Sequence, residues 1–142
     1  MALYLLETSI IGRKAMDKAG NAIDNASTAG AQAAAIPGEP AAFEYLARKY
    51  GKLPLKQSLE PAIRLARDGF PLYARLQGAI RYKRPVLLRS ADAAKAFLTI
   101  DGAVPEVGAI IKQPDLAATL EAIANQGAPG FYAGRIDRKS VV

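Results

Sequence analysis

Short stretches of helical periodicity, each ended by glycine or proline, constrain this chain more than any other feature of its sequence. Between Pro40 and Gly134, apolar residues recur at intervals of three and four, as they do along one face of an α-helix. Helices are expected over residues 40–50, 59–68, 72–83, 91–98 and 116–126. Between Pro40 and Gly134, only residues 104–111 are predicted to be extended, so the sequence predicts a mainly α fold.

The expected helix starts carry capping residues. Ser58, Ser90 and Asp115 each precede an apolar helical pattern, and a side-chain oxygen at that position can accept a hydrogen bond from the first turn. Pro61 then falls in the first turn of its helix, where a missing N–H costs little.

The expected helix ends are marked by glycine and proline. Gly51 is predicted to adopt a left-handed C-terminal cap, and Gly69 and Gly127 are predicted to end later helices. Pro85 is predicted to stop the helix before it, because the residue preceding a proline avoids the α region. Residues 128–132 are predicted to form a tight aromatic turn.

Composition excludes several kinds of chemistry. The chain has 142 residues, contains no His and no Cys, and carries a formal net charge of +6. Histidine-based catalysis, thiol nucleophiles and metal sites built from Cys are therefore excluded. No acidic spacing indicates a metal site, and no glycine-rich motif indicates a phosphate or dinucleotide site. We therefore expect no metal and no cofactor.

A basic run is the first candidate for function. Basic residues from Arg75 to Arg89 alternate with Tyr73 and Tyr82, and no acid interrupts them. Such a pattern can bind nucleic acid through phosphate contacts and base stacking. A solvated helix face explains the same run, so no nucleic-acid partner is expected.

The remaining candidates also have simpler explanations. The acidic residues Glu39, Glu44, Asp115 and Glu121 are accounted for by capping and surface positions. A nucleophile at residues 27–28, Ser-Thr, would need a neighbouring base that the sequence does not supply. No catalytic residue is assigned on this basis.

The chain also shows no membrane segment. No apolar run approaches the length of a membrane span, and the first residues lack the basic region of a signal peptide. On the sequence alone, a chain expressed as given is expected to stay in the cytoplasm.

Ordered blocks over about three-quarters of the chain resemble one family. The most specific is Leu-Glu-Pro-Ala-Ile-Arg-Leu-Ala-Arg-Asp-Gly-Phe-Pro at residues 59–71. The other blocks are residues 26–38, 45–55, 113–120 and 127–134. Together they resemble the large subunit of gamma-glutamyltranspeptidases.

This resemblance implies an N-terminal-nucleophile hydrolase with an αββα fold, of which this chain is a helical part. In the family, a precursor cleaves itself, and a Thr at the new N-terminus of the small subunit attacks the γ-glutamyl amide of glutathione or a related compound. The acyl group then passes to water, an amino acid or a peptide. The resemblance implies the small subunit and the rest of the large subunit as partners, and a periplasmic or secreted location.

Little of the family's catalytic machinery matches this chain. The nucleophile is expected beyond Val142, so the chain alone is expected to be inactive. The large subunit usually supplies an Arg that pairs with the substrate carboxylate. In the matching run, residues 4–8, that position holds Leu6. A leucine cannot make the charged pair.

The resemblance divides the chain into three segments, and two alternative functions stay open. Residues 1–25 are expected to be a weakly patterned, non-native start, residues 26–134 the helical large-subunit segment, and residues 135–142 a truncated tail. The alternatives are a fragment of a related cephalosporin- or glutaryl-type acylase and a basic nucleic-acid-binding helical module. An isolated segment of this kind is expected to be marginally stable and to expose apolar surface.

Overall fold

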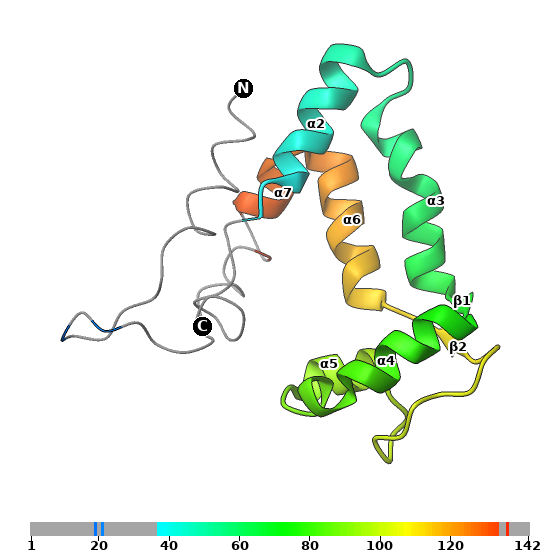
Figure 1. Cartoon of the computed structure of the whole chain (residues 1–142). Coiled ribbons are helices and arrows are strands. Elements are labelled where there is room, and N and C mark those ends of the chain that lie inside the picture. Colours follow the sequence, from blue (N-terminus) through cyan, green and yellow to red (C-terminus); the bar gives the residue numbers. More distant parts are fainter. Residues whose placement is uncertain (1–18, 20, 22–36, 134–135, 137–142) are drawn as a thin grey trace. The chain divides into compact units, whose positions relative to one another are not determined.

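A computed structural model describes residues 37–133 and, in addition, residues 19, 21 and 136. The chain divides into two compact units, Met1–Lys52 and Leu53–Val142, and each is described by itself. The expectations for residues 1–18 and for the tail lie outside the described residues. The described part is mainly helical (Figure 1), as the sequence predicts.

The first unit contains helix α2 (Glu39–Tyr50). The helix is confirmed, but its buried residues are Pro40 and Ala42, not the expected apolar stripe. In that stripe Leu46 remains 51% exposed and Tyr50 66% exposed. The Lys49 ammonium donates a hydrogen bond to the Tyr45 hydroxyl and lies over the rings of Tyr45 and Tyr50. The interaction with the Tyr45 hydroxyl, followed by that with Tyr50, raises the pKa of Lys49.

Gly51 ends α2, but the prediction of a left-handed cap is wrong. Its φ is −71° and its ψ is 139°, an extended conformation open to any residue. Its N–H donates to the carbonyls of Leu46 and Ala47. A Cβ at Gly51 would lie 2.5 Å from the Ala47 carbonyl oxygen, so close packing against the helix end is what requires glycine here.

The second unit is an antiparallel helix pair with a smaller helical pair inserted between its halves (Figure 1). Its elements are α3 (Leu55–Asp68), β1 (Phe70–Pro71), α4 (Ala74–Leu87), α5 (Ala91–Phe97), β2 (Ile110–Ile111), α6 (Pro114–Gln126) and α7 (Pro129–Tyr132). Helices α3 and α6 lie side by side, and α7 packs on α6.

A short strand pair closes this unit where α3 ends and α6 begins. Phe70 pairs with Ile111 in antiparallel register, and the Gln113 N–H donates to the Ala66 carbonyl at 2.8 Å. Gly69 makes the turn from α3 into β1 with φ +93°, a conformation that favours glycine. The pair holds the end of α3 against the start of α6 and so makes the two helices antiparallel.

The core lies beside this strand pair. Its buried members come from four different elements or loops: Leu72, Ile80, Leu98 and Ile111. Leu72 is 1% exposed, the lowest value in the core. Burying a side chain of this size contributes about 1.5–3 kcal/mol, so this cluster fixes α4 and α5 onto the strand pair.

Two expected helix starts are wrong. Helix α3 begins at Leu55, so Pro61 lies in the helix interior and Ser58 lies one turn inside. The Ser58 hydroxyl donates to the Pro54 carbonyl at 3.3 Å and does not cap the helix. Pro61 removes one backbone hydrogen bond, but the added turn gains others, including Ser58 N–H to Pro54 O at 3.1 Å.

Helix α6 begins at Pro114, and Asp115 lies in the first turn without a side-chain cap. Proline suits the first helical position because its fixed φ matches the helix. By contrast, the Ser90 cap of α5 is confirmed: its Oγ accepts from the Ala93 N–H at 3.3 Å.

Three further predictions about the ends and types of elements are wrong. Helix α4 continues through Pro85 to Leu87, because one lost hydrogen bond is offset when Leu87 packs on the core. Of the segment predicted to be extended, only β2 is a strand, since a turn bonds Ala109 N–H to Glu106 O. The expected aromatic turn is the short helix α7. Gly69 and Gly127, both with positive φ, end helices as predicted.

Candidate functional site

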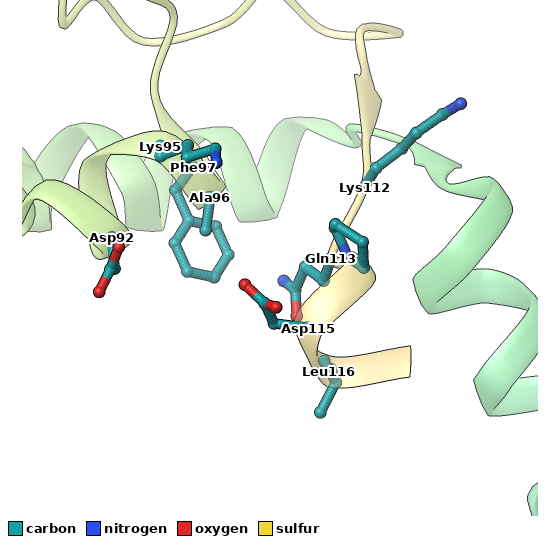
Figure 2. Close-up of a pocket in the computed structure, with 9 residues that line it drawn as sticks. Asp92, Lys95, Ala96, Phe97, Lys112, Gln113, Asp115 and Leu116 are labelled. Carbon is teal, nitrogen blue, oxygen red and sulfur yellow. The ribbon is translucent and has the colours of Figure 1, made fainter. Parts of the chain in front are cut away.

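A hollow of about 300 Å³ lies between α5 and the first turn of α6 (Figure 2). Its lining combines four charged residues with apolar ones and one amide: Asp92, Lys95, Ala96, Phe97, Lys112, Gln113, Pro114, Asp115 and Leu116. Figure 2 shows the Asp115 carboxylate between the Phe97 ring and Gln113, with Lys112 extending away. The sequence did not indicate this site, because the strand pair brings its two halves together.

The hollow does not provide the parts of an acyl-transfer site. No Ser, Thr or Tyr hydroxyl lines it. Lys95 and Lys112 are both exposed, and a lysine becomes nucleophilic only when desolvation or a neighbouring charge lowers its pKa. The hollow can therefore accommodate polar groups, but its residues have no nucleophile and base in place.

The hydroxyls of the described threonines serve the local fold. The Thr119 hydroxyl donates to the Asp115 carbonyl one turn earlier at 2.9 Å. The Thr99 hydroxyl donates to the Asp101 carboxylate and accepts from the Ala103 N–H at 2.9 Å. The Thr99 hydroxyl, followed by the N–H groups of Asp101 and Ala103, holds the pKa of Asp101 below its ordinary value. The base beside Thr99 is therefore a carboxylate of lowered pKa, which accepts a proton poorly, and no side-chain base is hydrogen-bonded to Thr119 among the residues described.

Asp115 and Glu121, two of the acidic residues singled out in the sequence, have different surroundings. Glu121 makes an ion pair with Arg67 that joins α6 to α3, whereas Asp115 faces the hollow. In the described ranges, no group of three acidic residues could hold a metal ion. Leu6 and residues 27–28 lie outside what the structure describes.

The basic residues of the run are all exposed, on α4 or, for Arg89, just after it, as the solvated-face interpretation predicts. The Arg84 Nε donates to the Gly102 carbonyl at 2.7 Å, so this guanidinium ties a turn to the helix. Tyr82 is 78% exposed, with the Lys83 ammonium 5.1 Å from its ring centre. Within the described part of the chain, no helix combines the length and apolar character needed to cross a membrane.

Comparison with known proteins decides the family. The family model described as Gamma-glutamyltranspeptidase matches residues 14–141. The chain belongs to the gamma-glutamyltranspeptidase family. It is 38% identical over 117 residues to Glutathione hydrolase 3 of Arabidopsis thaliana, covering 82% of this chain and 18% of the relative. It is 33% identical over 121 residues to the Glutathione hydrolase proenzyme of Escherichia coli, covering 85% of this chain and 21% of the relative.

A solved structure supports the same family. The gamma-glutamyltranspeptidase of Helicobacter pylori superposes with a TM-score of 0.83 at 34% identity, over 88% of this chain and 36% of that one. The chain thus spans about a fifth of the length of the two glutathione hydrolases. These relatives do not favour the acylase or nucleic-acid alternatives, and the matched region begins after Leu6.

Proposed function

We propose that this chain is a helical large-subunit segment of an enzyme that cleaves γ-glutamyl amides such as glutathione and transfers the acyl group to water, an amino acid or a peptide. The family match over residues 14–141 is the observation that carries the proposal. In the complete enzyme, an N-terminal Thr of the small subunit would attack the amide, with its own α-amine as the base. That chemistry needs neither of the residue types this chain lacks, His and Cys.

The role of this segment is then structural. The hydroxyls of its described threonines are engaged in local hydrogen bonds, and its hollow is lined by no Ser, Thr or Tyr hydroxyl. The partners of this segment would be the small subunit and the rest of the large subunit, and the family resemblance suggests export to the periplasm or medium. The purified 142-residue chain is therefore expected not to hydrolyse a γ-glutamyl anilide, and turnover by it would contradict the proposal.

A chimera tests the role directly. In the E. coli glutathione hydrolase proenzyme, only the residues that align with residues 37–133 of this chain would be replaced, by those residues. We expect the chimera to cleave itself into two subunits and to hydrolyse the γ-glutamyl anilide. The matched control carries Ile80→Asp, which places a charge in the core and should abolish both processing and activity. A well-folded chimera that neither processes nor turns over would refute the proposal.

A further inference from the structure

The uncharged part of the surface of helix α3 is wider than the part that α6 covers. At about 100° per residue, the residues without charge or amide occupy an arc of about 200°, whereas a surface helix usually needs an apolar stripe of about 100°. The charged residues Lys56, Glu60, Arg64, Arg67 and Asp68 all fall on the remaining side.

Helix α6 covers only one half of this arc. That half includes the two buried residues of α3, Ile63 and Ala66. The other half is made by Ser58, Pro61, Ala62 and Leu65, which we name the second face of α3. All four are exposed, Leu65 by 53%. An uncharged arc of this width is about twice the stripe that a surface helix needs to pack on one neighbour, so half of it is left over for a second surface.

We infer that the second face of α3 is an internal interface, covered by an uncharged, apolar surface of the large subunit outside this chain. This inference rests on the proposed function. The solved Helicobacter pylori relative is long enough to supply such a surface, because this chain covers only 36% of it. The small side chains at Ser58 and Ala62 would let a neighbouring helix or sheet approach closely.

A second copy of this chain is a poorer occupant. A stable dimer usually buries about 800 Å² on each partner, and Leu65 is the one large apolar side chain on this face. A surface belonging to the same polypeptide needs far less area, because covalent linkage supplies a high effective concentration. The charge of +6 on each chain also opposes self-association.

Cysteine labelling tests this inference without depending on activity. The chain contains no native cysteine, so Leu65→Cys introduces a single thiol. The matched control is Ile100→Cys, because Ile100 is fully exposed in the turn that follows α5. A maleimide reagent is applied to both variants, first in the isolated chain and then in the chimera described above.

We expect L65C and I100C to react at similar rates in the isolated chain. In the chimera, L65C should react at least tenfold more slowly, while I100C should be unchanged. Equal labelling of both in a folded chimera would overturn the inference, even if that chimera were active. Slow labelling of L65C in the isolated chain would overturn the inference too. If the labelling rate does not depend on protein concentration, the chain itself covers the second face. If the rate falls as protein concentration rises, a second copy of the chain covers it.

An active chimera with an unprotected second face would therefore refute the inference alone. An inactive chimera in which L65C is protected would refute the proposed function alone. As a second readout, Leu65→Lys should leave the unfolding of the isolated chain unchanged but lower the melting temperature of the chimera, and Ile100→Lys should affect neither.

Discussion

Gly130→Ala should destabilise the chain although the substitution adds only one methyl group. Gly130 is buried in α7, where that helix crosses α6. A Cβ at this position would lie 2.3 Å from the Ala122 carbonyl oxygen and 2.6 Å from its carbonyl carbon. Both contacts are with the backbone of α6, so no side-chain rotation can relieve them. Helix α7 would have to move away from α6.

The expected cost follows from two opposing terms. Overpacking of this kind costs about 1–3 kcal/mol, and contacts this short place Gly130 at the upper end. Replacing glycine in a helix by alanine returns about 0.5–1 kcal/mol. The free energy of unfolding should therefore fall by about 2 kcal/mol, which lowers the ratio of folded to unfolded chain roughly 30-fold.

Gly78→Ala is the matched control for this prediction. Gly78 lies in α4 with nothing within 4 Å of the added Cβ, so the substitution creates no overpacking. The higher helix propensity of alanine then acts alone and should raise the free energy of unfolding by about 0.5–1 kcal/mol. Urea unfolding followed by circular dichroism would measure both variants. If Gly130→Ala were neutral or stabilising, the reasoning from the α6–α7 contact would be refuted.

Three more outcomes are expected of the isolated chain. Ser90→Ala should lower the free energy of unfolding by about 1 kcal/mol, because the bond from Ala93 N–H is lost; denaturant titration measures it, and Ser90→Asp should retain the bond. Thr99→Val should raise the pKa of Asp101 toward its ordinary value, measured by NMR titration. Since that pKa is lowered in the folded chain, the stabilisation is present above the unfolded pKa and is lost as pH falls through the folded pKa. Finally, heating should give a broad transition at modest temperature with binding of an apolar dye; a sharp transition at high temperature would contradict marginal stability.

Apolar periodicity was enough to predict that these helices exist, but not where they begin. The order of α3, α4, α5 and α6 follows from residue spacing, and Ser90 caps α5 as expected. Ser58 was wrong as a cap because residues 55–57 before it joined the helix, and Asp115 was wrong because the helix begins one residue earlier, at Pro114. Local propensity is a weak guide to a boundary when one extra turn can add backbone hydrogen bonds.

The candidate site was harder to predict than the fold. Phe97 and Asp115 are 18 positions apart, and they reach the same hollow because Phe97 packs on the core that contains Ile111 of the strand pair. The ion pair between Arg67 and Glu121 likewise joins two helices that only folding brings side by side. A periodic sequence pattern does not predict which residues of two separate helices come into contact, because that depends on where each helix ends and how the two pack.

The sequence by itself determined the helical class, the order of the helices and the family, because apolar spacing, glycine and proline positions and ordered motifs are local properties of the chain. The tertiary structure alone decided why particular glycines are needed. The sequence predicted a left-handed cap at Gly51 and a tight turn around Gly130, yet neither has a positive φ. Each lies where an added Cβ would meet the backbone of a helix, and that kind of constraint exists only once the chain has folded.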